Sequence, residues 1–107
     1  MIKVMAVLTR KAGTTREHFE QEWAVTHPPL VAKLPGLRRY LQHPAVSHKD
    51  KRWPHDGIAE LYFDTMKDVA VAFSSDAAGL IFAHEDEFLE SMEWFLVDTD
   101  QIREPLA

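Results

Sequence analysis

Residues 1–40, MIKVMAVLTRKAGTTREHFEQEWAVTHPPLVAKLPGLRRY, decide the fold because they contain one complete strand–helix–strand unit. Side chains alternate along residues 2–9 with a period of two, which is typical of a β-strand, and enough of both sets are apolar to indicate cover on both faces. Capping threonines and an apolar stripe predict a helix over residues 14–34, which Pro35–Gly36 ends. A second strand is predicted over residues 37–46.

The rest of the chain repeats this order. A polar stretch over residues 43–57, with two prolines, three histidines and one tryptophan, predicts a long exposed loop between the halves. Alternation and helical periodicity then resume, with Asp64 or Thr65 as a possible helix cap. The predicted elements are a strand over residues 58–64, a helix over 65–73, an interruption at 74–76, a helix over 77–88 and a strand over 92–98.

This order predicts an α+β fold of the ferredoxin-like type. The chain runs β-α-β-β-α-β, and its four-stranded antiparallel sheet carries the helices on one face. A length of 107 residues fits a single domain over residues 1–107. The face without helices is expected to carry Met5, Val7, Tyr40, Ile58 and Tyr62. Because an apolar face of this size is rarely left to water, we expect a second copy of the chain to cover it.

Composition narrows the class of protein. The net charge is −5 and there is no cysteine. An acidic chain without a basic patch argues against nucleic-acid binding, and the lack of cysteine excludes disulfides, thiolate metal sites and thiol catalysis. The chain opens directly into a strand, and no apolar run approaches the ~20 residues of a membrane helix. We therefore expect a cytoplasmic protein that binds neither nucleic acid nor membrane.

His27 is the first candidate for chemistry. It follows Trp23 by four residues on the apolar stripe of the first helix, so a titratable ring lies on a core-facing side. Pro28–Pro29 disfavour helical backbone before them and lack an N–H. The helix is therefore predicted to break or kink at His27 and to leave the carbonyls of Ala24 and Val25 unpaired. Two interpretations fit: a site for chemistry, or a core histidine hydrogen-bonded to one of those carbonyls.

The other histidines give weaker indications. His84 interrupts the apolar stripe of the helix over residues 77–88 as His27 interrupts its own, and a core position is the preferred interpretation. The acidic run at residues 85–87 indicates a solvated face. The three loop histidines are separated by four and six residues, which matches no zinc pattern, so we expect neither a metal nor a cofactor.

The chain resembles the EthD family, within the dimeric α+β barrel superfamily. The resemblance rests on four segments: Phe19-x-x-x-Trp23 before His27–Pro28, Leu34–Pro35–Gly36–Leu37 before Tyr40, DGIAELYFD at residues 56–64, and EDEFLESMEWFLVDT at residues 85–99. It covers nearly the whole chain. It implies a homodimer whose cavity, between helices and sheet, takes a small aromatic or cyclic substrate without metal or organic cofactor.

The resemblance extends to a lactone isomerase of methyl-aromatic catabolism, 4-methylmuconolactone methylisomerase. It implies His27, Tyr40 and His55 as catalytic residues, with His48 as the alternative to His55. His55 is preferred because it directly precedes the third strand. Burial lowers the pKa of a histidine and favours a neutral base at position 27. The tyrosine hydroxyl can donate to a carbonyl or a developing enolate oxygen.

Substrate contacts are expected from Trp23, Trp53, Glu60, Tyr62 and His84. Trp53 fits either a lid or a dimer contact, and Glu60 fits either a pocket carboxylate or, as we prefer, an ion pair with Arg38 or Arg39. The predicted function is a cofactor-independent enzyme, of isomerase or lyase type, that uses His and Tyr for acid–base chemistry on a cyclic or aromatic catabolic intermediate. The alternatives are a noncatalytic accessory protein that binds a ligand for an oxidative pathway, and a cofactorless oxygenase that uses Tyr40 and Trp53.

Overall fold

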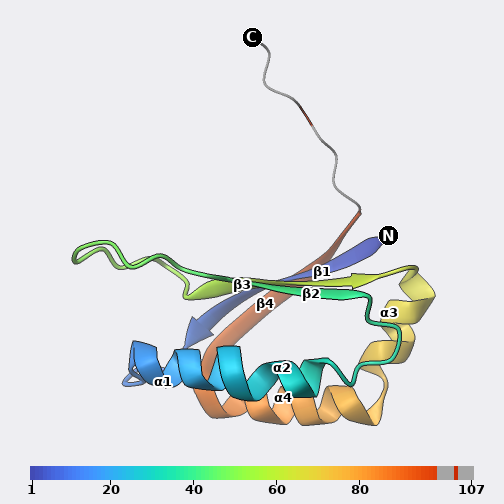
Figure 1. The fold of residues 1–107 in the computed structure, drawn as a ribbon, viewed down its shortest axis with the longest axis horizontal. Helices are drawn as coiled ribbons and strands as arrows, with labels where there is room; N and C mark the ends of the chain where they lie inside the picture. Colours follow the sequence, from blue (N-terminus) through green and yellow to red (C-terminus); the bar gives the residue numbers. More distant parts are fainter. Residues whose placement is uncertain (99–102, 104–107) are drawn as a thin grey trace.

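A four-stranded antiparallel sheet carries the helices on one face (Figure 1). The computed structural model describes residues 1–98 and 103. The strands lie in the order β2-β3-β1-β4 and pair antiparallel, which confirms the predicted α+β fold of ferredoxin-like type. The elements are β1 (Ile2–Arg10), α1 (Arg16–Glu20), the π-helical segment η1 (Gln21–Thr26), α2 (His27–Val31), β2 (Arg39–Pro44), β3 (Gly57–Phe63), α3 (Met66–Phe73), α4 (Asp76–Phe88) and β4 (Leu89–Asp98).

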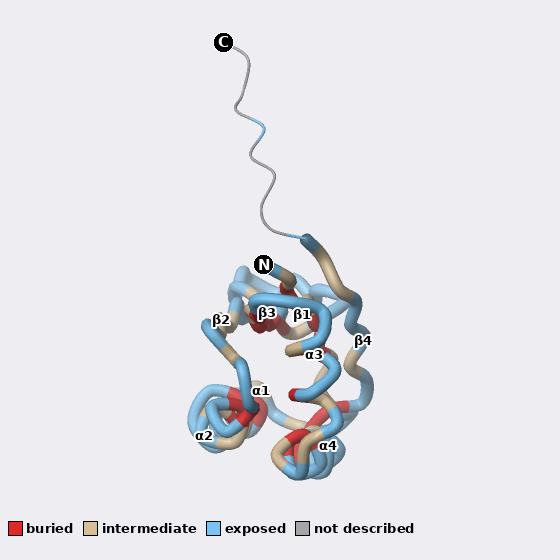
Figure 2. The backbone as a smooth tube through the Cα atoms, turned by 90° about the vertical axis from the view of Figure 1, so that its right-hand side faces the viewer, coloured by how far each residue is buried: buried red, intermediate tan, exposed pale blue. Residues whose placement is uncertain are grey.

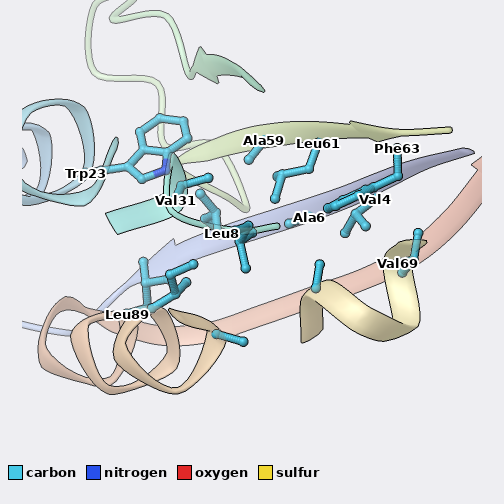
Figure 3. Packing of buried hydrophobic residues seen from close by; sticks show 14 of the residues in the cluster. Val4, Ala6, Leu8, Trp23, Val31, Ala59, Leu61, Phe63, Val69 and Leu89 are labelled. Carbon is cyan, nitrogen blue, oxygen red and sulfur yellow. The ribbon is translucent and has the colours of Figure 1, made fainter. Parts of the chain in front are cut away.

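Alternate side chains of the two central strands form the middle of the core. Val4 and Ala6 of β1 lie opposite Leu61 and Ala59 of β3 in the strand register, and all four are buried. Because successive strand residues point to opposite faces, this set turns toward the helices while its neighbours turn away. Figure 3 shows these side chains between the sheet and the helices, and Figure 2 shows that buried positions of the helices face the same layer.

Most predicted elements are present, with shifts at their ends. Thr15 begins the first helix, and its hydroxyl accepts a hydrogen bond from the His18 N–H. The predicted interruption is confirmed at Ser74 and Ser75, whereas Asp76 already belongs to α4, which the Ser75 hydroxyl caps. The last strand begins at Leu89, three residues earlier than predicted, because α4 leads into β4 without a loop. Within the described ranges, no helix is long and apolar enough to cross a membrane.

Of the predicted break or kink at His27, the break is wrong, because the helix continues and widens instead. Residues 21–26 form a π-helix, and the His27 N–H bonds to the Glu22 carbonyl five residues back. With this five-residue spacing, the Trp23 carbonyl would accept a hydrogen bond from the backbone N–H of residue 28. Residue 28 is a proline and has no N–H, so the Trp23 carbonyl has no partner within the helix. The Trp23 carbonyl accepts from the Gln42 side chain instead, at 2.7 Å. The freed acceptor thus lies one residue earlier than α-helical spacing predicts.

The sheet face away from the helices is apolar around a charged centre. Glu60 accepts from Lys3 Nζ at 3.4 Å and lies 2.5 Å from His43 Nε2, and Tyr62 donates to it at 3.4 Å. Glu60 therefore forms an ion pair as predicted, but with Lys3 and not with Arg38 or Arg39. Arg38 pairs with Asp64 instead.

The prediction that Tyr40 lies on this outer face is wrong. It pairs with Leu61 in the register of β2 and β3, and its ring lines the cavity on the helix side. The outer apolar set is completed by Phe95 of β4, which lies opposite Met5.

Gly57 gives the first testable prediction. A Cβ at this position would lie 2.6 Å from Trp23 Cη2 and 2.8 Å from Cζ3, closer than real Cβ contacts. Gly57→Ala is expected to displace the indole and to lower the free energy of unfolding by about 1–3 kcal/mol, as overpacking does. Gly79→Ala is the control, since nothing lies within 4 Å of its Cβ. Urea unfolding of both variants measures the difference, and equal stabilities would contradict the placement of Trp23.

Candidate active site

A cavity lies between the helix-facing side of the sheet and the helices. Its empty space is about 500 Å³ when the open mouth is included. Aliphatic side chains of β1 and β3 form its floor. The rest of the wall includes four aromatic side chains, those of Trp23, Phe73, Phe82 and Trp94. The ionisable side chains that line it within the described part of the chain are His27, Tyr40 and Glu85.

Two buried histidines meet where the helices pack. α2 and α4 lie side by side beneath the sheet (Figures 1 and 2) and bring together His27 and His84, which are 3% and 7% exposed. The two Nδ1 atoms are 2.8 Å apart, and His84 Nε2 lies 2.7 Å from Oε2 of Glu22. The result is a continuous chain of hydrogen bonds from a carboxylate at the protein surface to an imidazole in the cavity wall, which we call the Glu22–His84–His27 chain.

The contacts of this chain determine the tautomers when both imidazoles are neutral. The Glu22 carboxylate can only accept, so Nε2 of His84 carries a proton and its Nδ1 is bare. Nδ1 of His27 must then donate to it, which leaves Nε2 of His27 with a free lone pair. That lone pair belongs to the ring that lines the cavity, and it lies 3.7 Å from Oε2 of Glu85. The arrangement presents a proton acceptor to a bound molecule.

Tyr40 presents a proton donor to the same cavity. The Gln42 amide donates to both the Trp23 carbonyl and the Tyr40 hydroxyl oxygen, each at 2.7 Å. Because the phenol oxygen already accepts this bond, its own hydrogen is available to a ligand. Burial raises the pKa of Tyr40 to about 12, so the hydroxyl stays protonated at neutral pH. The proline that leaves the Trp23 carbonyl unpaired therefore helps to orient Tyr40 through Gln42.

Burial shifts the two other ionisable groups in opposite directions. Desolvation, with the proximity of His84, lowers the pKa of His27 to about 4, so the imidazole is neutral at pH 7. Desolvation, with the proximity of Asp86, raises the pKa of Glu85 to about 7, so this carboxyl is partly protonated at neutral pH. A neutral base and a carboxylic acid in one cavity are the pair that general acid–base catalysis requires.

The structure brings together some of the predicted site residues and separates others. His27, Tyr40 and Trp23 line the cavity, and His84 lies directly behind His27. His27 bonds to His84 and not to a carbonyl freed by the prolines. His55, by contrast, contacts Thr9 Oγ1 at 3.0 Å in a separate polar depression.

Three more of the predicted residues lie outside the cavity. Trp53 borders the polar depression and donates its indole N–H to the Val46 carbonyl. Glu60 and Tyr62 lie on the outer face of the sheet. The predicted set is therefore divided among the cavity, the β2–β3 loop and the face without helices.

Sequence reasoning missed Glu85, Glu22 and Gln42. The prediction that residues 85–87 form a solvated face is wrong for Glu85, whose side chain is 14% exposed. The sequence did indicate that Glu85 faces the core, because it follows helical spacing with the buried residues Ala78, Ile81 and Phe88. Gln42 could have been found as the i+2 neighbour of Tyr40 on the same strand face. Nothing in the sequence pairs Glu22 with His84.

The loop histidines do not converge. His43 contacts Glu60 on the outer face, while His55 contacts Thr9 at one end of the sheet. Within residues 1–98 and 103, no group of three or more His, Asp or Glu side chains is arranged to hold a metal ion.

Glu85→Gln tests the buried carboxyl through the pH dependence of stability. The pKa of Glu85 is raised in the fold from 4.5 to about 7, so the folded state binds its proton more tightly than the unfolded state. The stability that this proton confers is present below pH 4.5 and is lost as the pH rises through 7. Glutamine, which cannot ionise, should be more stable than wild type by an amount on the order of 2–3 kcal/mol at pH 8, and nearly equal at pH 4.5. Urea unfolding at both pH values measures this, and a pH-independent difference would contradict a buried carboxyl.

Comparisons with known proteins place the chain among small ferredoxin-like proteins. A model of the EthD domain matches residues 11–91. No curated protein matches the sequence. Among solved structures, an ethyl tert-butyl ether D (EthD) family protein from Bacillus halodurans is 20% identical, with a TM-score of 0.80 over 94% of this chain and 99% of that one.

Two further structures share the fold at lower identity. A dimeric ferredoxin-like protein of unknown function from Thermobifida fusca is 14% identical, with a TM-score of 0.71 over 90% of this chain and 88% of that one. A mutant of SnoaB, a cofactor-independent oxygenase from Streptomyces nogalater, is 16% identical, with a TM-score of 0.68 over 94% of both chains. At these identities the likeness is one of fold.

Proposed function

The chain belongs to the EthD family, and from this premise we propose that it is a cofactor-independent enzyme that moves a proton on a small cyclic or aromatic carbonyl compound, with His27 as the general base. The observation that carries the proposal is the Glu22–His84–His27 chain, which runs from the surface through two buried imidazoles to the cavity. A histidine with a purely structural role needs only one partner. Here a carboxylate and a second imidazole hold a ring that lines the cavity, and its bare Nε2 lies 3.7 Å from Oε2 of Glu85.

The proposed reaction begins at Nε2 of His27. This nitrogen removes a proton from a carbon next to the substrate carbonyl, and the electron pair of the broken C–H bond moves into an enolate. The Tyr40 O–H donates a hydrogen bond to the enolate oxygen, where negative charge develops. The imidazolium that forms is stabilised through His84 by the Glu22 carboxylate. Return of the proton to a different carbon gives an isomer and restores neutral His27.

In reactions where His27 does not itself return the proton to the substrate, Glu85 is proposed to donate it. Its carboxyl lies 3.7 Å from Nε2 of His27, which is the wrong distance for a direct hydrogen bond but leaves both groups facing the same ligand. Its pKa, raised to about 7, allows it to give and regain a proton near neutral pH. An isomerase of lactones needs these two steps. A lyase needs the first step and the loss of a leaving group.

The experiment that tests the proposal measures deuterium incorporation by proton NMR in D₂O. The probes are α-angelica lactone and 2-indanone, both neutral cyclic carbonyl compounds with exchangeable C–H protons. The proposal expects the protein to accelerate exchange above the buffer rate and to convert α-angelica lactone into its conjugated isomer. Exchange at the buffer rate for both probes, with binding shown by shifts of the cavity tryptophans, would favour a noncatalytic binding protein.

A cofactor-independent oxygenase is the second candidate function. Two observations favour it: the solved SnoaB structure shares the fold, and the aromatic walls of the cavity suit a polycyclic substrate. Its first step is the same proton removal, after which the carbanion would reduce molecular oxygen. The residues available for this step are His27 and Tyr40, whereas Trp53 lies outside the cavity. Oxygen consumption with an anthrone as substrate distinguishes this reaction from isomerisation.

We further propose that the chain forms a homodimer through the outer face of the sheet. Phe95 and Ile58 are exposed on that face, and the Thermobifida fusca relative is described as dimeric. Light scattering at micromolar concentration is expected to give about twice 12.3 kDa. Phe95→Arg should shift the mass to that of a monomer, whereas Val71→Arg, at an exposed helix position, should leave it unchanged. A monomeric wild type would contradict the proposed dimer.

A further inference from the structure

The cavity and the cationic side chains of the chain are kept apart. Within the described part of the chain, no lysine or arginine lines the cavity, whereas the carboxyl group of Glu85 does. Two more carboxylates, Asp86 and Glu90, border the adjoining depression between α4 and β4. A different depression is lined by five of the twelve lysine and arginine side chains, Arg10, Lys11, Arg16, Lys51 and Arg52.

We propose that the cavity selects uncharged, flat cyclic carbonyl compounds and rejects carboxylates of the same size and shape. The inference rests on the proposed function in placing the ligand in this cavity, and it adds the charge class of the substrate. A carboxylate that enters loses its water and finds no cation to replace it, which is strongly unfavourable. It also meets Glu85, whose ionised form repels it.

The polar groups of the cavity fit a neutral carbonyl compound. Tyr40 offers one hydrogen-bond donor, because Gln42 already satisfies its oxygen as an acceptor. His27 offers one acceptor, the bare Nε2. A ketone or lactone has the complementary pair, a carbonyl oxygen and an adjacent acidic C–H. A carboxylate has two negatively charged acceptor oxygens, and C–H bonds next to it are far less acidic than those next to a ketone or lactone carbonyl.

The walls fit a flat molecule. The rings of Phe73 and Trp94 are nearly parallel, with an angle of 12° between their planes, and Phe73 and Phe82 are inclined by 21°. Phe82 and Trp94 are both partly exposed, so they form the rim where a ligand enters. Aromatic faces of this kind favour planar apolar rings over extended or highly hydrated ligands.

The experiment compares ligands of matched size and shape in which a neutral carboxamide replaces a charged carboxylate. The two pairs are coumarin-3-carboxamide with coumarin-3-carboxylate, and benzamide with benzoate. Binding at pH 7.5 is followed through the indole N–H signals of uniformly ¹⁵N-labelled protein. Trp23 and Trp94 report on the cavity, and Trp53 is an internal control because it lies at the polar depression. The neutral member of each pair is expected to bind at least about 100-fold more tightly, the scale set by burying an uncompensated charge.

A cation placed at the rim should reverse this preference. Phe82→Arg introduces one where the side chain is partly exposed, so the fold should tolerate it. We expect coumarin-3-carboxylate to gain at least about tenfold in affinity for this variant. Leu80→Arg is the control, because Leu80 is exposed on the same helix and does not line the cavity. Glu85→Gln should narrow the difference between carboxamide and carboxylate without a cation.

The outcomes separate this inference from the proposed function. Carboxylates that bind wild type as tightly as the carboxamides, or the failure of both neutral probes to move the Trp23 and Trp94 signals, would overturn the selection for uncharged ligands. Neither result depends on catalysis. The proposed function fails on a different measurement, when neutral ligands bind in the cavity and no probe exchanges protons faster than in buffer.

Discussion

Replacement of His27 by glutamine is expected to reduce the rate of enzyme-dependent deuterium exchange by about 10²–10⁴-fold, the usual contribution of a general acid–base group. Glutamine fills most of the volume of the imidazole, and its amide can still donate to Nδ1 of His84, the atom 2.8 Å from His27 in the wild type. The variant removes the basic nitrogen and keeps the cavity wall. Ligand affinity should therefore stay within a few fold while exchange is lost.

The control for this variant is His43→Gln, which changes a histidine on the outer face and should leave the exchange rate unchanged. Imidazole nitrogen shifts of the wild type provide a second check, because they should show protonated Nδ1 on His27 and protonated Nε2 on His84 near pH 7. A His27→Gln protein with a lowered melting temperature but full exchange per folded molecule would refute the catalytic assignment. That result would leave His27 as a core residue and favour a binding protein.

Phe88→Ala is expected to have the largest effect on stability. Phe88 is fully buried, and its ring lies 4.9 Å from that of His84, 5.8 Å from that of His27 and 6.0 Å from that of Phe19. Truncation leaves a cavity that rigid neighbours cannot fill and should lower the free energy of unfolding by about 3–5 kcal/mol. This is a large part of the 5–15 kcal/mol typical of a whole domain.

Urea unfolding at pH 7.5 measures the loss, with Leu80→Ala on the same helix as the control. Leu80 is 56% exposed, so its truncation should change the free energy by less than about 0.5 kcal/mol. Because Phe88 supports both imidazoles, the surviving folded protein should also show altered His27 and His84 signals. A loss below 1 kcal/mol with unchanged histidine signals would mean that the ring does not support the two histidines.

The fold was predictable because its signals are local and repeated. Alternation along residues 2–9 and 58–64, and turn residues such as Pro35–Gly36, depend on near neighbours in the sequence. The same locality explains the errors. The extent of β2 depends on its pairing with β3, and the helix over residues 16–31 escapes the predicted break because tertiary packing tolerates a π-helix. A rule about proline and its preceding residue cannot include that packing.

The candidate site was predictable in its residue types but not in its partners. His27 and Tyr40 could be selected because each departs from the pattern around it or matches the family resemblance. The His27–His84 contact joins residues that are 57 positions apart, and the His84–Glu22 contact joins residues 62 positions apart. Glu85 was assigned to solvent because a run of three acidic residues is usually exposed. Only the packing of α4 against α2 turns one of the three inward.

In the π-helical segment over Gln21–Thr26, the number of residues determines how the helix before it is rotated about its axis relative to α2. Each residue of an α-helix advances the direction of its side chains by about 100°. If one residue were removed here and the segment became regular α-helix, the part before it would turn by roughly that angle relative to α2. Phe19 would then leave the core even though its own sequence neighbours were unchanged. When two sequences of such a helix are aligned, a single-residue gap in this segment indicates that the helix before the gap is rotated. Residues before the gap can then face different directions even though they are aligned with one another.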